Sequence, residues 1–253
     1  MNLHYKQYGA GEPMIILHGL FGTLDNWQTL ARQWADDLMI FAVDQRNHGR
    51  SPHTDAFDYQ LLAEDIRDFM ESQFMHRAHL LGHSMGGKAA MQVALEYPDQ
   101  VDRLVVVDMG VRGYPGGHEE IFKALFALDL VNVKSRKAAD AFLAARIEDA
   151  GVRQFLLKNL TRNKAGGYAW KANVQALHDN YAHILAPISG TPFEGPTLFI
   201  RGAESRYVQD QDIPTLQQLF PNSRVETVAD AGHWVHAEQP EAVYRLVRDF
   251  LVE

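Results

Sequence analysis

The serine in the stretch Leu80 to Gly87 (LLGHSMGG) is the residue whose setting points most directly to chemistry. Ser84 lies between Gly82 and Gly86 in a Gly-x-Ser-x-Gly pattern, after apolar residues typical of a strand and before a helix-forming run. A turn of this kind strains the backbone and exposes the hydroxyl at the edge of a sheet, and the glycines let neighbouring backbone come close. The pattern predicts that Ser84 is a nucleophile, and a structural serine in a tight turn is the alternative.

A serine hydroxyl needs a base to take its proton, and the base needs a third group to orient it. His233 is the candidate base, because it follows Gly232 on a loop between the last predicted strand and the last predicted helix. Several of the 12 histidines are expected at the surface or in packing. His236 is the nearest competitor, and packing under the last helix is its alternative role.

The orienting acid has two candidates. Asp108 ends the apolar run Leu104 to Val107, the next predicted strand after the one that precedes Ser84. A carboxylate there can reach an imidazole from a neighbouring strand tip, since the geometry of such a triad does not depend on chain order. Glu204 follows the strand 197–200, which comes after the expected cap. In most proteins with this arrangement of serine and histidine the acid follows that strand, and here Ser205 occupies its position. Neighbouring residues of an extended segment face opposite ways, so Asp108 is favoured and Glu204 stays the alternative.

Two backbone amides must also face the oxygen that becomes negative during the attack. Met85 supplies one, because it begins the predicted helix after the nucleophile, where the helix dipole favours negative charge. The other is expected from the loop His18 to Gly22 (HGLFG), with Leu20 as the first choice and Phe21 as the second.

Positioning these residues requires a scaffold that brings distant loops together. Apolar runs alternate with amphipathic segments, which is typical of a largely parallel sheet covered by helices. The expected strands are 14–17, 40–43, 78–81, 104–107, 197–200 and 225–228, and the helices between them are 27–34, 61–73, 85–97, 213–219 and 241–251.

One segment interrupts this alternation. Between residues 111 and 185 we expect amphipathic helices and no strand, and the helical periods fit 119–128, 135–147, 151–160 and 173–184. The sequence therefore predicts a core of residues 1–110 and 187–253, with an inserted helical cap of residues 111–186.

Composition excludes several function classes. The net charge of -8 argues against nucleic acid as a partner. The absence of cysteine excludes disulfides and a thiol nucleophile. The chain shows no export signal and no apolar stretch near the roughly 20 residues that span a bilayer, so we expect a soluble, cytoplasmic protein. Metal-binding spacing and phosphate-binding glycine spacing are both missing, so we expect neither a metal nor a cofactor.

Four motifs together resemble the α/β-hydrolase superfamily, and in particular the small bacterial esterases of the YbfF type. They are HGLFG at 18–22, Asp44-x-Arg46-Asn47-His48-Gly49-x-Ser51, GHSMGGK at 82–88 and GHWVH at 232–236. The resemblance covers essentially the whole chain. It implies the α/β-hydrolase fold, a mostly parallel central sheet flanked by helices, with a helical cap over the site. It also implies hydrolysis of short-chain acyl esters or thioesters, with Asp108 as the acid and Ser205 at the usual acid position. Within the second motif, Asp44 and Arg46 are interpreted as structural.

The hypothesis is a serine carboxylesterase that acts on small acyl esters, as a monomer or small homo-oligomer. Apolar residues are expected to line its pocket, although most of those in the cap also fit the cap's own core. The predicted pocket residues are Phe21, Phe122, Phe126 and Trp234, with Leu125 and Phe155 as further cap candidates. A carbon–carbon bond hydrolase with the same triad is one alternative. A ligand-binding signalling module with little turnover is the other.

Overall fold

The central sheet is built mostly from parallel strands. In the computed structural model, which describes residues 1–163 and 166–252, the sheet has seven strands in the order β1-β3-β2-β4-β5-β8-β9. Only the edge strand β1 runs antiparallel to its neighbour. The strands are β1 (Tyr5–Tyr8), β2 (Pro13–Leu17), β3 (Met39–Val43), β4 (Ala78–His83), β5 (Val101–Val107), β8 (Thr197–Gly202) and β9 (Ser223–Val228).

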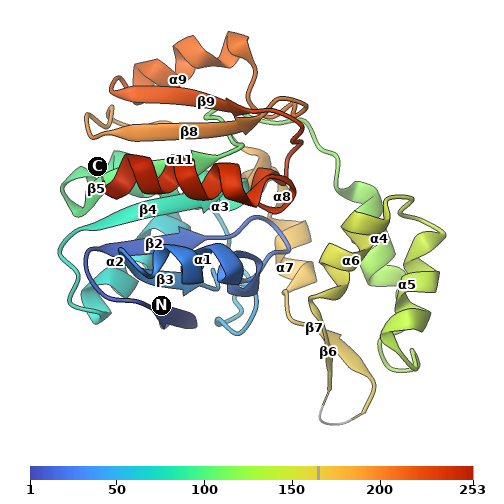
Figure 1. The fold of residues 1–253 in the computed structure, drawn as a ribbon. Helices are drawn as coiled ribbons and strands as arrows, with labels where there is room; N and C mark the ends of the chain where they lie inside the picture. Colours follow the sequence, from blue (N-terminus) through green and yellow to red (C-terminus); the bar gives the residue numbers. More distant parts are fainter. Residues whose placement is uncertain (164–165, 253) are drawn as a thin grey trace.

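Helices cover both faces of this sheet (Figure 1). Successive side chains of a strand point to opposite faces. Ile15 and Leu17 therefore join the hydrophobic cluster that also holds residues of α2 and α3, while Met14 and Ile16 join the cluster with residues of α1 and α11. The core helices are α1 (Gln28–Trp34), α2 (Tyr59–Ser72), α3 (Met85–Glu96), α9 (Ile213–Leu219), α10 (Val235–Glu238) and α11 (Pro240–Val252), with short 3-10 turns η1 (Leu24–Trp27), η2 (Pro98–Gln100) and η3 (Asp210–Asp212). Of the helices in the described ranges, none has the length and apolar character needed to cross a bilayer.

The segment between β5 and β8 stands beyond the end of the sheet in Figure 1, and we call residues 111–186 the cap. Two antiparallel strands in it correct the expectation of helices alone, because strands of three residues are too short to show an alternating pattern. The predicted helix 173–184 is divided at Asn180, whose side chain bonds the carbonyls of Ala176 and Asp55. The elements are α4 (Glu119–Ala127), α5 (Arg136–Ala144), α6 (Ala150–Leu157), β6 (Leu160–Arg162), β7 (Tyr168–Trp170), α7 (Val174–Asp179) and α8 (Tyr181–Leu185).

The cap joins the core through two stems, residues 111–114 and 185–188. Two backbone hydrogen bonds tie the stems together: the Tyr114 amide donates to the Leu185 carbonyl, and the Ile188 amide donates to the Val111 carbonyl, each at 2.9 Å. Lys88, on the helix that follows Ser84, connects both stems to the core.

Lys88 is almost completely buried, with 1% of its surface exposed. Its Nζ donates to the carbonyl of Arg112 at 2.9 Å and to that of Ala186, one in each stem. The rings of Tyr59 and Tyr114 lie 5.6 and 4.9 Å from the nitrogen. Burial, reinforced by the nearby charge of Arg112, lowers the pKa of Lys88 to about 7.

Candidate functional site

Four of the predicted site residues follow neighbouring strands of the sheet. Ser84 follows β4, Asp108 follows β5, Ser205 lies just beyond β8, and His233 lies in the loop after β9. These strands are parallel and adjacent in the order β4-β5-β8-β9. Because the carboxyl ends of parallel strands meet at one edge, residues far apart in the sequence come together there.

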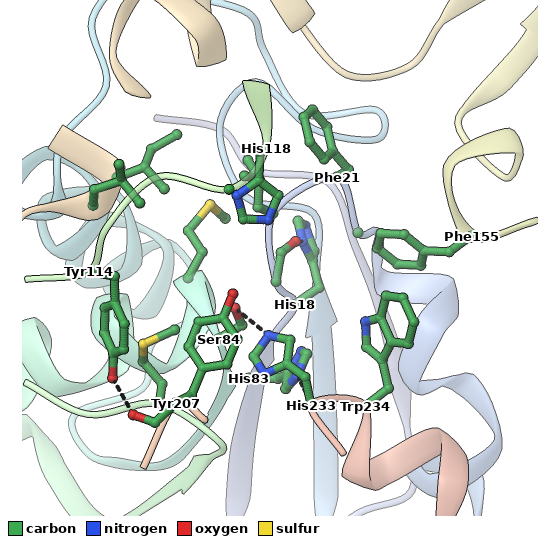
Figure 2. A pocket seen from close by; sticks show the side chains of 18 of the residues that line it. His18, Phe21, His83, Ser84, Tyr114, His118, Phe155, Tyr207, His233 and Trp234 are labelled. Atoms are coloured by element: carbon green, nitrogen blue, oxygen red, sulfur yellow. Dashed lines mark hydrogen bonds between the residues drawn. The ribbon is translucent and has the colours of Figure 1, made fainter. Parts of the chain in front are cut away.

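Ser84 occupies the tight turn that its flanking glycines predict. Its φ of 54° and ψ of −121° lie outside the regions that residues with a side chain normally adopt. A Cβ at Gly82 would collide with the carbonyl of Gly86, and a Cβ at Gly86 with that of Leu17. The turn directs the hydroxyl into the site, where Oγ lies 3.0 Å from Nε2 of His233 (Figure 2).

Asp108 is fully buried beside His233. The Nδ1 of His233 lies 2.7 Å from Oδ2 of Asp108, and the Ser205 hydroxyl donates to the same oxygen. The amide of Gly202 donates to Oδ1 at 3.2 Å. Since a carboxylate only accepts hydrogen bonds, Nδ1 carries the proton, and Nε2 of the neutral ring is left to accept from the hydroxyl of Ser84.

The competing residues lie differently. Glu204 is exposed, and within the described residues its carboxylate makes no hydrogen bond to His233. His236 stacks on the ring of Trp27 with the centroids 4.3 Å apart. The geometry therefore favours Asp108 over Glu204 and His233 over His236 for any shared role with Ser84.

Two aromatic residues that the sequence analysis did not single out hold His233 in place. The ring of Tyr207 stacks on that of His233, with centroids 3.9 Å apart and 19° between the planes. His83 donates from Nε2 to the His233 carbonyl at 2.8 Å. Burial, with repulsion from His236 and His233, places the pKa of His83 well below its usual value, so its ring is neutral. In the sequence, only its position next to Ser84 could have marked His83 as a site residue, and no pattern marks Tyr207.

The loop after β2 contains the predicted amide donors. The amide of Phe21, which has a φ of 58°, donates to Nε2 of His48 at 3.2 Å, and the Gly22 amide donates to the Gly19 carbonyl at 2.8 Å. In the described part of the chain, the Leu20 amide has no such partner. The Leu20 amide is therefore free to meet a ligand, and the Phe21 amide is not.

Two buried histidines hold this loop. His48 donates from Nδ1 to the Arg46 carbonyl at 2.9 Å, which leaves its Nε2 as an acceptor. His18 likewise accepts the Gln45 amide at Nε2, over 3.1 Å, with its Nδ1 on the Gly19 carbonyl. Burial lowers the pKa of His18 to about 4 and that of His48 to about 3. Both rings are therefore neutral at neutral pH and keep the acceptor that the loop requires.

The Asp44 and Arg46 side chains make structural contacts, as expected. The carboxylate of Asp44 accepts the amides of Leu24 at 2.8 Å and Arg50 at 2.9 Å. The Arg46 guanidinium lies 2.6 Å from the carboxylate of Asp65. Among the described residues, neither side chain bonds Ser84, and both hold loop backbone or a neighbouring helix in place.

The cap also touches the loop after β2. Asn159, buried between α6 and β6, donates from its side-chain amide to the carbonyl of Phe21. The Phe21 carbonyl belongs to the peptide bond between Phe21 and Gly22. By bonding it, the cap helps to hold this part of the loop in its orientation. No local pattern in the sequence marks Asn159 for this contact.

A cavity of about 710 Å³ opens beside Ser84 and is walled by both core and cap. Leu20, Phe21 and Trp234 line it from the core. Figure 2 shows Trp234 facing Phe155 of the cap, and their ring centroids lie 5.7 Å apart. The walls are mainly apolar, which suits an apolar ligand with few polar groups.

Two predicted pocket residues lie elsewhere. Phe122 is buried between cap and core, where its ring packs against Phe21 of the core and Tyr181 of the cap, and Phe126 is 46% exposed. Neither lines the cavity. The reason is helical geometry: α4 turns Ile121 toward the cavity, and each following residue points about 100° further round the helix.

Comparison with known proteins gives a consistent family. Residues 12–240 match the family described as alpha/beta hydrolase fold. The chain is 40% identical over 240 residues to "Esterase YbfF" of Escherichia coli (strain K12), covering 94% of this chain and 92% of that protein. It is 38% identical over 249 residues to "sn-1-specific diacylglycerol lipase ABHD11" of Mus musculus, covering 94% of this chain and 80% of that one.

A solved structure agrees with these relatives. The structure described as "Marine microorganism esterase" superimposes with a TM-score of 0.96 at 39% identity, covering 98% of this chain and 99% of the other. The similarity extends over nearly the whole chain, so it includes the sheet, the turn at Ser84 and the loop of His233 described above. The chain belongs to the α/β hydrolase fold family.

Proposed function

We propose that this protein is a serine carboxylesterase that hydrolyses small, short-chain acyl esters through an acyl-enzyme on Ser84. The observation that carries the proposal is the unbroken hydrogen-bonded series from the Ser84 hydroxyl through His233 to Asp108, at the wall of a mostly apolar cavity. The names esterase and lipase among the relatives support the same class of bond. Thioesters, which carry the same electrophilic carbonyl, are a second substrate class for the same chemistry.

The first step is attack by Ser84 on the ester carbonyl carbon. As the Oγ–carbon bond forms, Nε2 of His233 takes the hydroxyl proton, and Asp108 stabilises the imidazolium through Nδ1. The carbonyl oxygen becomes an oxyanion that accepts hydrogen bonds from the amides of Met85 and Leu20. Met85 begins α3, whose first amides have no carbonyl partner within the helix.

The tetrahedral intermediate then collapses. His233 returns the proton to the alcohol oxygen as the bond between that oxygen and the acyl carbon breaks, which leaves the acyl group on Ser84. His233 next removes a proton from water, the water oxygen attacks the acyl carbon, and the carboxylic acid leaves as Ser84 recovers its proton. Ser205 supports both halves by donating to Asp108, which holds the carboxylate toward His233.

The cap, residues 111–186, is proposed to set substrate size. Trp234 and Phe155 close one side of the cavity, and Tyr114 and Tyr207 lie on the other side of Ser84 in Figure 2. These walls favour compact apolar acyl groups, because a short chain is enclosed while a long one must extend into solvent.

The test compares p-nitrophenyl acetate, butyrate, octanoate and palmitate as substrates for the wild type and Ser84→Ala. We expect turnover of the short esters, a decline with chain length, and a loss of at least about 10³-fold in kcat for Ser84→Ala. A fluorophosphonate probe should label the wild type and leave the variant unlabelled. Tight binding of the esters without turnover by the wild type would contradict the proposal and favour a ligand-binding module.

A further inference from the structure

The cap contributes a histidine, His118, to the lining of the cavity beside Ser84. It immediately precedes α4, and its ring lies among the residues that line the cavity (Figure 2). It is near enough to His233 for charge on that ring to oppose its protonation. The hydrolytic steps above use one histidine, so this second ring has no part in them.

The contacts of Tyr181 determine which nitrogen of His118 carries the proton. The phenol oxygen accepts the His118 amide at 3.1 Å. A phenol is a stronger donor than acceptor, because one lone pair of its oxygen is delocalised into the ring, so with this bond accepted the hydroxyl donates its own proton. The available acceptor is Nδ1 of His118, 2.7 Å away. The neutral ring therefore has its proton on Nε2.

Nε2–H is then a donor without a partner in the described residues, on a ring that faces the cavity. The ring is neutral at neutral pH, because burial, with the charge of His233, lowers the pKa of His118 below its usual value. A neutral ring fixed in this tautomer cannot take a proton at Nδ1 without breaking the bond from Tyr181. It is suited to hydrogen bonding and unsuited to serving as a second base.

We propose that His118 is a specificity-determining residue whose Nε2–H donates to a second acceptor oxygen of the substrate, close to the scissile ester. The inference rests on the proposed esterase function and narrows its substrate class. The favoured esters carry an ether, hydroxyl, keto or further ester oxygen a few bonds from the carbonyl that Ser84 attacks. A site with a fixed donor discriminates against an analogue that leaves the donor unpaired.

The experiment uses two isosteric pairs of esters. p-Nitrophenyl methoxyacetate and p-nitrophenyl butyrate differ by one oxygen in the acyl group, and 2-methoxyethyl butyrate and butyl butyrate carry the corresponding difference in the alcohol group. For each pair, kcat/KM for the ether is divided by that for the hydrocarbon, and the quotient for the wild type is divided by that for a variant. Intrinsic reactivity cancels in this double ratio.

His118→Phe removes the donor but keeps a ring, and we expect a double ratio of about 5 in at least one pair, the worth of one ordinary hydrogen bond. His118→Gln, whose amide can reach the position of Nε2, should return the ratio toward 1. Tyr181→Phe frees the tautomer and should give an intermediate value. His178→Phe is the matched control, because His178 packs on Phe122 in the cap and does not line the cavity.

Double ratios of 1 in both pairs for His118→Phe, with the wild type hydrolysing all four esters, would overturn the role of His118 alone. A wild type that hydrolyses none of the four would overturn the esterase function and this inference with it. A ratio for His178→Phe equal to that for His118→Phe would assign the effect to the cap as a whole, and would also overturn the proposal.

Discussion

The core and the cap contribute to the site in different ways. In the core, Ser84, Asp108 and His233 follow strands of one parallel sheet, and each strand is fixed by its ladder of hydrogen bonds to the next. The cap consists of short helices and two three-residue strands, and the segments between them supply single side chains: His118 lines the cavity, and Asn159 contacts the loop after β2.

This difference suits the core to holding the reacting groups and the cap to contacting the substrate. Bond-making groups need positions fixed to within a fraction of an ångström, and a sheet buried on both faces provides them. Groups that only pack against a substrate or donate a hydrogen bond to it tolerate the looser attachment of a cap held by two stems. The core should therefore determine the rate of the chemistry, and the cap should act through substrate choice and through the few contacts that reach the core.

The largest effect should come from the core. Asp108→Asn keeps the shape of the side chain but allows the wrong tautomer of His233, so kcat on p-nitrophenyl butyrate should fall by on the order of 10⁴-fold with KM little changed. Glu204→Gln is the matched control, because the exposed Glu204 makes no hydrogen bond to His233 among the described residues. A greater loss in Glu204→Gln than in Asp108→Asn would mean that the acid belongs to the other strand.

A smaller effect should come from the point where the cap touches the loop after β2. Asn159→Leu removes the donor to the Phe21 carbonyl, and the loop that carries the Leu20 amide should then lose part of its alignment. Complete loss of one such amide costs about 10²- to 10³-fold, so we expect kcat to fall by roughly 10-fold for this indirect change.

The control for Asn159→Leu is Asn180→Leu, which removes another bond from cap to core, the donation to the Asp55 carbonyl at 2.7 Å. Inhibition by a trifluoromethyl ketone, which forms a tetrahedral oxyanion, should weaken in Asn159→Leu and hold in Asn180→Leu. Equal losses of kcat in the two variants would show that Asn159 only docks the cap and does not align the loop.

The smallest effect on turnover should come from Lys88→Met at the cap stems. The change leaves two partly buried carbonyls, of Arg112 and Ala186, without their donor, which should lower the free energy of unfolding by about 1–3 kcal/mol. It should change kcat by only a few-fold, since the Lys88 side chain makes no hydrogen bond to Ser84, His233 or Asp108 among the described residues. The bond from the Lys88 amide to the Ser84 carbonyl belongs to the backbone and is kept in the variant. Urea denaturation and steady-state kinetics at one pH measure both quantities.

The lowered pKa of Lys88 also makes the free energy of unfolding depend on pH. Its pKa is about 7 in the folded chain against a usual 10.5, so between these values the unfolded chain binds the proton that the folded chain lacks. The free energy of unfolding should therefore rise with pH in this window, by at most about 1.4 kcal/mol per unit. The advantage of the wild type over Lys88→Met should be constant below pH 7 and grow from pH 7 to 9. An advantage that stays constant from pH 6 to 9 would mean that Lys88 remains charged when folded.

The sequence predicted the α/β architecture because buried parallel strands give continuous apolar runs that need no tertiary information. It missed β1, whose residues Tyr5 to Tyr8 mix polar and apolar types on a half-buried edge, and it missed the short cap strands. It predicted that Ser84, His233 and Asp108 act together, and the structure brings them within hydrogen-bonding distance. It misplaced Phe122 and Phe126, because an amphipathic period gives a helix an apolar face without saying what that face meets.

What the sequence alone determined are the features fixed by local backbone chemistry: the serine turn between Gly82 and Gly86, the strand that leads into it, and the glycine that precedes His233. What only the tertiary structure decided are the partners of side chains from distant segments. His48 occupies the amide of Phe21, Tyr181 sets the proton position on His118, and Asn159 bonds the loop after β2. Those contacts follow from the strong tendency of buried donors and acceptors to find partners, and the spacing of residues along the chain does not give a partner's position in space.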